Sequence, residues 1–334
     1  MLWGGAGMPG YNGLLMRDSL QDTGVIPSPG YPYYSPDLIC HEQVADPQSF
    51  FTGNYDTDPN QPVQLGSQTN FFYVRTKNLS DGPVSGWYIH CYRSSASLFM
   101  TPSIWKNNPL YTRSGNPFVQ TGSIASGAVG VGQDNFLLDA ISSPLFCMIG
   151  VASPSSTPSI PDGFTSYGDY VLWVRQNQNV CGRNLTYLQS FPDRQFSRLD
   201  ALSNPSNEAV PVLAKVEARG PLPAGTTFGV QCAPAGLNAS GDTSNTTLIT
   251  GSGMTPAQFD GTVTTWGSLP AGVNTWPPGA TLTTTLYYGQ DIGHAAHQYG
   301  EPWERFSVRP GEIEGMPRDG VLVRLGDTGT VFLA

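Results

Sequence analysis

Oxygen side chains recur at alternate positions in one short segment, the spacing by which a tight loop directs its ligands at one calcium ion. Asp56, Asp58 and Asn60 hold the first, third and fifth positions. The sixth position is Gln61 instead of the glycine that such a loop needs, and the twelfth is Ser67 instead of a bidentate glutamate. We therefore interpret the segment as an Asx-rich turn, with calcium binding as the weaker alternative.

Two histidines lie three residues apart near carboxylates, a combination that can bind a transition metal. They are His294 and His297, with Asp291 and Glu301 nearby. Histidines at this spacing converge only on a helical turn, whereas 287–293 has the pattern of a strand that runs into a loop. The sequence therefore predicts solvated loop histidines, and we assign no metal and no other cofactor.

The five cysteines are widely spaced and include no Cys-x-x-Cys pair, so they do not predict a dense disulfide framework. Cys91, Trp105 and Cys147 follow the order of the cysteine, tryptophan and cysteine of antibody domains. Leu145, however, stands where that pattern has a tyrosine. We expect buried free thiols.

Sequence patterns of common catalytic sites are missing. The chain has neither a Gly-x-Ser-x-Gly elbow nor a His-Glu-x-x-His run. Glu312 and Glu314 are a carboxylate pair of the kind that glycosidases use, but surface charge is the default interpretation of such a pair. We therefore expect that the protein is not an enzyme, and a secreted hydrolase domain stays an alternative that needs a convergent pair of acids.

The overall composition predicts a mainly β protein. Of 334 residues, 39 are glycine and 29 are proline, while charged residues make up only 12%, which favours short strands joined by turns. A net charge of −9 repels a nucleic-acid backbone. No run approaches the roughly 20 apolar residues that span a bilayer. Many aromatic residues with few lysines suit subunit interfaces and glycan-binding faces.

Alternating apolar positions predict the strands and the core. Trp87, Ile89 and Cys91 form one stripe of period two, and a second stripe contains Leu145, Cys147 and Ile149. We expect both stripes in the core of one sandwich. A single short helix is predicted after Ser166, because Asp169 three residues later completes a helix-start signal.

These patterns divide the chain into three parts. Residues 1–34 form an extended N-terminal arm, 35–200 a first β-sandwich and 201–334 a second β-sandwich, with the boundary in the polar, turn-like stretch 200–207. The tail 321–333 is expected to be a C-terminal hairpin around the turn residues of 326–329.

A known bacterial family has a similar order of elements. Pro36-Asp37-Leu38 precedes an aromatic and β-branched run at 71–77, followed by the turn residues 78–83 and the strand 87–92. This order resembles the cell-adhesion-related domain of bacteria, CARDB. The resemblance implies an immunoglobulin-like sandwich that is secreted or surface-bound and adhesive, and it carries over no catalytic residue.

The segment before Ser35 combines glycine, proline and aromatic residues, so we expect it to mediate association. Trp3, Tyr11, Tyr31 and Tyr33 are the predicted interface residues, and packing of the arm on its own domain is the alternative. The predicted partners are other protein subunits, including a second copy of this chain, and surface glycans.

We therefore expect a structural or adhesive protein made of two immunoglobulin-like sandwiches. One alternative is a structural component of a virion or of a contractile injection apparatus, which the arm favours. The other is a carbohydrate-binding module. Localisation stays open among extracellular, surface-associated and particle-associated, without a classical signal peptide.

Overall fold

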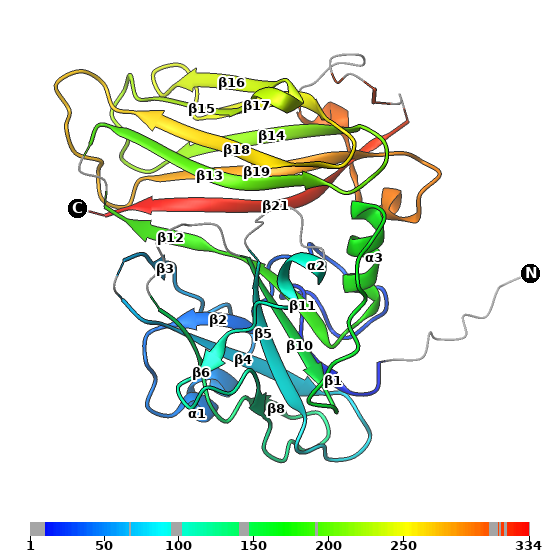
Figure 1. Ribbon diagram of the computed structural model, residues 1–334. Coiled ribbons are helices and arrows are strands. Elements are labelled where there is room, and N and C mark those ends of the chain that lie inside the picture. The colour runs from blue at the N-terminus through cyan, green and yellow to red at the C-terminus, as the bar shows by residue number, and fades with distance from the viewer. Residues whose placement is uncertain are drawn as a thin grey trace, which may run out of the picture.

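The computed structural model describes residues 11–333 apart from 67, 95–101, 140–146, 191–192, 307–312, 314 and 317–318. The chain is mainly β with several antiparallel sheets, as its composition predicts. Figure 1 shows two halves, one above the other, with the strands of the first part of the chain below and those of the second part above.

The lower half contains strands rich in aromatic and β-branched side chains. They are β1 (Leu14–Leu15), β2 (Leu38–His41), β4 (Asn70–Asn78), β5 (Tyr88–Ser94), β6 (Tyr111–Thr112), β7 (Val119–Gln120), β8 (Val129–Val131), β9 (Phe136–Leu138), β10 (Cys147–Ser153) and β11 (Val180–Asn184). A six-stranded sheet has the order β1-β4-β9-β6, with β2 and β8 also paired to β4. It packs on a four-stranded sheet of order β11-β10-β5-β7 through a shared apolar core.

The upper half is a sandwich of longer strands. They are β12 (Thr186–Gln189), β13 (Gln195–Asn204), β14 (Val210–Arg219), β15 (Thr227–Cys232), β16 (Leu237–Asp242), β17 (Leu248–Thr255), β18 (Phe259–Ser268), β19 (Thr281–Gln290), β20 (Glu301–Pro302) and β21 (Val321–Phe332), joined by β3 (Val63–Gln64). One sheet has seven strands in the order β17-β14-β19-β21-β12-β3 with β20 on β21, and the other has the order β13-β18-β15-β16. Phe228 and Val263 of the smaller sheet share a core with Val216 and Leu282 of the larger one.

Short helices occupy the connections. They are α1 (Pro47–Gly53), α2 (Pro102–Trp105) and α3 (Tyr167–Gln176), with 3-10 turns η1 (Ala233–Ala235), η2 (Ala295–Tyr299) and η3 (Trp303–Phe306). α3 is the predicted helix, and Ser166 caps it by accepting a hydrogen bond from the Asp169 amide. α1 was not expected, although its Asp46 cap and Pro47 at the first helical position are a helix-start signal. Of the described helices, none has the length and apolar character to span a bilayer.

Two strands from the predicted first domain, β3 and β12, complete the upper seven-stranded sheet. β12 lies parallel to β21, with Leu188 opposite Val331, and β3 lies parallel to β12, with Val63 opposite Tyr187. The predicted boundary between 200 and 201 falls inside β13, which runs on to Asn204, so it is wrong. The backbone of one sheet thus joins both halves.

The predicted extended arm is not found in residues 11–34, which pack against their own chain. Leu14 and Leu15 pair with β4, and these two side chains and Met16 are at most 1% exposed. The cover that this aromatic segment needs is therefore supplied by its own chain, and the alternative of packing in cis holds for the described residues.

The predicted C-terminal hairpin is also wrong, because β21 runs unbroken from Val321 to Phe332. The register shifts at a bulge beside Gly326, between its pair with Leu286 and the next pair with Tyr287. Asp327 accepts a hydrogen bond from Tyr34, and Thr328 donates one to Asp200. Residues that favour a turn locally are therefore held extended by tertiary contacts.

The two predicted core stripes lie on opposite faces of one sheet. Ile149 of β10 is opposite Tyr92 of β5, whereas Cys91 is opposite Gly150. Ile89 and Cys91, with the half-buried Trp87 against them, therefore face the lower core, while Cys147 and Ile149 face the core shared with the upper half. Leu145 lies outside the described residues. The period of two was correct, but the expectation of a single core was not.

Candidate functional site

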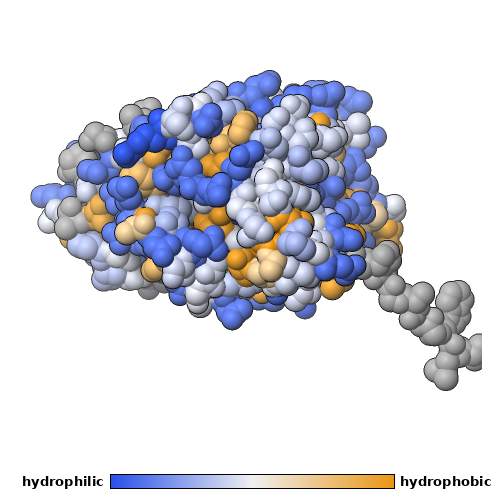
Figure 2. All heavy atoms as spheres, turned by 90° about the horizontal axis from the view of Figure 1, so that it is seen from below, coloured by the Kyte–Doolittle hydropathy of each residue, from blue (hydrophilic) through white to orange (hydrophobic). Residues whose placement is uncertain are grey.

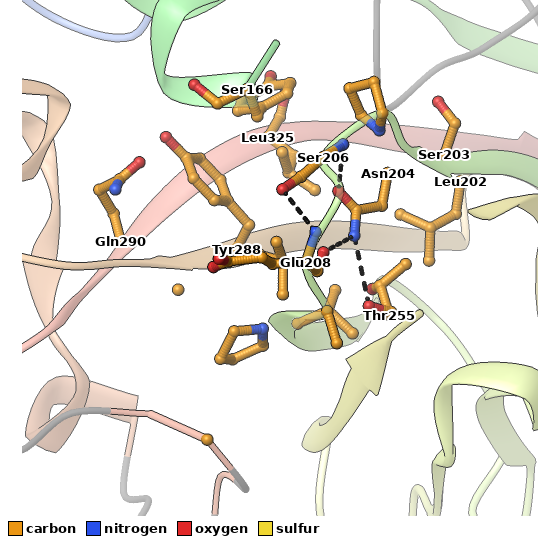
Figure 3. A pocket seen from close by; sticks show the side chains of 18 of the residues that line it. Ser166, Leu202, Ser203, Asn204, Ser206, Glu208, Thr255, Tyr288, Gln290 and Leu325 are labelled. Carbon is orange, nitrogen blue, oxygen red and sulfur yellow. Dashed lines mark hydrogen bonds between the residues drawn. The ribbon is translucent and has the colours of Figure 1, made fainter. Parts of the chain in front are cut away.

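A recess of about 280 Å³ opens between the start of α3 and the ends of several upper strands. Figure 3 shows its walls, with Ser166 above, Tyr288 and Gln290 on one side and Ser203 and Asn204 on the other. The β13–β14 connection, the end of β17 and the end of β19 bring these side chains together. The recess has room for a small molecule of a few heavy atoms and its water.

Two hydroxyl groups in the walls have no hydrogen-bond partner among the described residues. They belong to Tyr288, which is 6% exposed, and to Ser203. Burial raises the pKa of Tyr288 well above its ordinary value, so this hydroxyl is a donor at neutral pH. Tyr288 and Ser203 lie on opposite sides of the recess, so they do not converge on one atom (Figure 3). Nothing in the sequence indicates that the Tyr288 hydroxyl lacks a partner.

The opposite wall is held rigid by Asn204. Its amide nitrogen donates to the carbonyl of Glu208 at 2.8 Å and to that of Thr255 at 3.4 Å, and its oxygen accepts from the Ser206 amide at 3.0 Å (Figure 3). Asn204 is therefore occupied by the loop that it closes, and its role is structural.

A serine, a histidine and an aspartate meet near the mouth of the recess, but in the wrong order for a catalytic triad. Asp169 lies between the other two: Ser166 Oγ donates to its carboxylate at 2.8 Å, and His294 Nε2 lies 3.4 Å away. In a triad the histidine lies between serine and acid. Burial opposes charge on Asp169, but hydrogen bonds from Ser166 and Thr165 and the nearby His294 together lower its pKa. The group is a helix cap with a histidine against it.

The other side chains that were considered as metal ligands are dispersed. His297 contacts the carbonyl of Asp319 at 2.9 Å, and Glu301 accepts from Tyr31 at 2.7 Å. Within the described ranges no three His, Cys, Asp or Glu side chains are arranged to hold a metal ion. Glu312 and Glu314 lie outside the described residues.

The calcium candidates have structural partners instead. Asp58 forms an ion pair with Arg183 at 2.7 Å and accepts from the Asn60 amide at 3.2 Å, which is the Asx turn that the sequence predicts. Asn60 accepts from the Cys40 amide at 2.8 Å. Asp56 is exposed in the same turn. Two of the three side chains are thus occupied by the protein itself.

Two of the predicted interface tyrosines, Tyr31 and Tyr33, join the two halves of their own chain. Tyr33 is fully buried, with its hydroxyl 2.5 Å from that of Tyr167. Tyr31 donates to Glu301, and Tyr11, half-buried, donates to the Leu14 carbonyl at 3.4 Å. Trp3 lies outside the described residues. Of these four, Tyr33 in particular is inaccessible to another subunit.

Tyr34 and its neighbours form the strongest part of this junction. Its hydroxyl donates to Asp327 at 2.5 Å and accepts from Arg324, and Arg324 also lies over the Tyr31 ring, 5.0 Å from its centre. We call Tyr31, Tyr33 and Tyr34 the tyrosine clamp. Sequence spacing does not indicate the clamp, since its partners lie between 134 and 293 residues away along the chain.

A second buried polar cluster explains the Pro-Asp-Leu segment. Asp37 is fully buried and accepts from Arg17 at 2.7 Å and from Arg75 at 3.1 Å, while Arg17 also lies over the Tyr55 ring. Arg75 donates further to backbone carbonyls, including that of Asn54 at 2.7 Å. The carboxylate thus neutralises part of an interior cationic cluster, and its role is to hold the lower half together.

All five cysteines are free and buried, as expected. Burial raises the pKa of Cys40 to about 12 and that of Cys91 further, so both stay thiols at neutral pH. Cys147 and Cys91 lie on opposite faces of their sheet. The antibody-like order of Cys91, Trp105 and Cys147 therefore does not correspond to an intersheet pair.

The face seen in Figure 2, which is the underside of the lower half, is a mosaic. Hydrophobic areas are interrupted by hydrophilic ones over the part of this face that the structure describes. Four of the exposed large hydrophobic side chains belong to the lower half, namely Leu20, Val25, Phe50 and Tyr111. Isolated exposures of this kind are normal on a protein surface and do not identify an interface.

Comparisons with known proteins give no family. No protein-family model matches the chain, and no curated protein matches it. Among solved structures, a transglutaminase of red sea bream has 8% identity and a TM-score of 0.18 over 81% of this chain and 30% of its own. The CupB6 tip adhesin of Pseudomonas aeruginosa has 6% identity and a TM-score of 0.18 over 80% of this chain and 90% of its own. At such TM-scores neither likeness carries an argument about fold or function.

Proposed function

We propose that this protein is a non-catalytic structural or adhesive component that acts through its surface. The observation that carries the proposal is the joining of both halves into one body. Strands from two distant parts of the chain share the seven-stranded sheet, and the tyrosine clamp adds side-chain hydrogen bonds across the same junction. A body built in this way holds its surfaces at fixed positions. Such rigidity suits a protein that bears mechanical load or binds partners through its surface.

The placement of the charged groups supports the same proposal. Asp37 neutralises Arg17 and Arg75, and Asp169 accepts from a capping serine. A catalytic acid or base must instead face a substrate with its proton available. These carboxylates have structural partners, so they favour a scaffold over an enzyme.

The adhesive role is preferred to the particle role. The exposed arm was the feature that suggested assembly into a virion or an injection apparatus, and residues 11–34 pack on their own chain. The CARDB-like character of the first sandwich stays part of this proposal, because the motif at Asp37 lies in the buried cluster that holds that half together.

Retention of protein-coated beads under flow tests the proposal. Beads coated with the folded protein should be held on surfaces that present polysaccharide or protein, more strongly than beads coated with heat-unfolded protein. Release of reducing sugar or of new amino termini with turnover would instead establish an enzyme. Sedimentation of the free protein separates the particle role, which requires a large defined assembly.

A further inference from the structure

One face of the smaller upper sheet is open to solvent and has an unusual composition. In β13, β18, β15 and β16 the residues alternate between the buried core and this outer face, as the exposure of Ser197, Leu199, Gln231 and Asn238 indicates. We call it the outer face. With strands about 4.8 Å apart and about 3.4 Å per residue, it measures roughly 14 Å by 27 Å, enough for several sugar rings.

Trp266 of β18 lies on the outer face, two residues from the end of its strand. It stands between Ser197 of β13 and Gly229 of β15 in the strand register. A Cβ atom placed on Gly229 would lie 2.5 Å from two atoms of the Trp266 ring, so the indole covers the backbone of Gly229. Trp266 is nevertheless only half-buried. Part of the side chain therefore covers the sheet, and part of it is accessible to solvent.

The surroundings of Trp266 are polar and uncharged. Thr264 lies between Leu199, which is 48% exposed, and Gln231, and Gln231 is opposite Asn238. The charged side chains on this face of the four strands are Asp242 and Asp260, near its ends. The half-buried aromatic ring therefore shares this face with amide and hydroxyl groups and with Leu199.

A hollow of about 480 Å³ lies at the end of the outer face next to Trp266. Part of its wall is formed by Gln195 and Ser268. These two residues are paired with each other, two residues along the strands from the pair of Ser197 and Trp266. Asp193, Arg194 and Asn274 complete it. The Cα atom of Ser268 is about 7 Å from that of Trp266, the distance between alternate residues of a strand, so the hollow offers donors and acceptors close to the ring.

We propose that the outer face binds a neutral polysaccharide, with a sugar ring stacked on Trp266 and its neighbours reaching the hollow. A sugar presents an apolar C–H face, which an indole covers well, and equatorial hydroxyls that suit Gln231, Asn238 and Thr264. This inference rests on the proposed surface-contact function and names its ligand class.

Other partners fit this face less well. A protein interface concentrates several apolar anchors at its centre, whereas this face has one aromatic ring and the exposed Leu199 among mainly hydrophilic side chains. Nucleic acids and anionic polysaccharides need cations, and the outer face of these strands has none, in a chain of net charge −9. The cation of the hollow, Arg194, lies next to Asp193 in the chain and donates to the Leu269 carbonyl at 2.9 Å. Neutral sugar chains are left as the chemistry that matches.

Affinity electrophoresis in native gels tests the proposal. The folded protein should be retarded by hydroxyethyl cellulose or dextran and not by polygalacturonate. Trp266→Ala should weaken retardation at least tenfold, whereas Tyr111→Ala, which removes an exposed aromatic ring from the lower half, should leave it unchanged. Because Trp266 covers Gly229, its loss can disturb folding, so the exposed pair Gln231→Ala and Asn238→Ala provides a second variant with an expected loss of threefold or more.

Several results would overturn the inference: no retardation of the wild type by the neutral polymers, equal retardation of the Trp266 variant, or retardation by polygalacturonate alone. Self-association that Trp266→Ala abolishes, without sugar binding, would also overturn it. If bead retention on protein surfaces persists while these polymers fail, the ligand class is wrong and the surface-contact function stands. If bead retention fails as well, both proposals fall.

Discussion

His90 illustrates how a single buried side chain links stability to pH. It is 4% exposed, stacks on Tyr92 at 5.9 Å and has no hydrogen-bond partner for Nε2 among the described residues. Burial lowers the pKa of His90 to about 4. The folded protein therefore holds this ring neutral at pH values where the unfolded chain protonates it.

We predict that the contribution of His90 to stability is lost as the pH falls from about 6.5 to about 4. The unfolded chain takes up a proton near pH 6.5, the folded protein takes it up only near pH 4, and the difference amounts to up to about 3 kcal/mol. Urea unfolding of the wild type and His90→Phe at pH 7 and pH 4.5 measures it. The wild type should lose more stability than the variant, and equal losses would contradict the assignment.

Asp37 shows what the sequence could and could not provide at this scale. Pro36-Asp37-Leu38 correctly indicated the approach to a strand, which is β2. The role of Asp37 as the counter-ion of Arg17 and Arg75 was not predictable, because neither arginine lies at a spacing that local structure would bring to it. Buried ion pairs depend on the finished fold.

At the scale of elements, β13 carries an ion pair into the interior of the upper sandwich. Arg198 and Asp200 are each at most 2% exposed and contact each other at 3.0 Å. Arg198 also donates to Thr330, and Thr328 donates to Asp200. Both are flanked on the same face by Phe196. The polar stretch 200–207 predicts a turn at Asp200, and the strand forms instead because Asp200 has a partner, Thr328 of β21, that lies far along the chain.

Breaking this pair from one side should cost more than removing both charges. Asp200→Leu leaves Arg198 buried without its counter-ion, which costs about 3–5 kcal/mol. The double variant Arg198→Met with Asp200→Leu should recover most of that loss, since two apolar side chains then fill the same space. A double-mutant cycle from denaturant unfolding checks this. Additive losses would show that the two residues act independently.

β10 is a strand with a core on each face, so adjacent residues should both be sensitive to truncation. Ile149 faces the core shared with the upper half and Met148 the lower core, and neither is exposed. Ile149→Ala and Met148→Ala should each cost about 2–5 kcal/mol. Reversible unfolding measures both. A loss below about 0.5 kcal/mol, typical of surface positions, would contradict the burial of that residue.

At the scale of the whole molecule, the N-terminal segment is a structural part of the body. We predict that removing residues 1–30 prevents folding, because the loss of Leu14, Leu15 and Met16 at about 2–5 kcal/mol each is comparable with the stability of a typical domain. Circular dichroism and sedimentation of the truncated protein measure this. Leu20→Ser, at a position 45% exposed, is the control and should change stability by less than about 0.5 kcal/mol.

A folded truncated protein that differs only in its assembly state would contradict this prediction. It would also restore the earlier expectation that the segment before Ser35 mediates association. The deletion therefore separates packing within one chain from contact between chains.

The fold class was predictable from the sequence, and the connections between its parts were not. Glycine, proline and the period of two indicated antiparallel sheets, and Ser166 with Asp169 indicated α3. The hairpin at 326–329 and the boundary at 200 were wrong, because tertiary hydrogen bonds outweigh local turn preference there. The position of Trp266 was not predictable from the sequence, because it depends on the packing of its ring against Gly229 of the neighbouring strand β15.

The position of β21 has a consequence for the order of folding. It is the last of the described strands along the chain, yet it lies between β19 and β12. Neither neighbour can complete its hydrogen bonds on that side before β21 has been synthesised. During synthesis the lower strands emerge first, and β12, which pairs with β3 on one side, has no partner on its other side until β21 is made. Long-range pairing of this kind is slow. A nascent chain stalled before residue 321 would therefore expose open strand edges, and its survival in the cell should depend on chaperones.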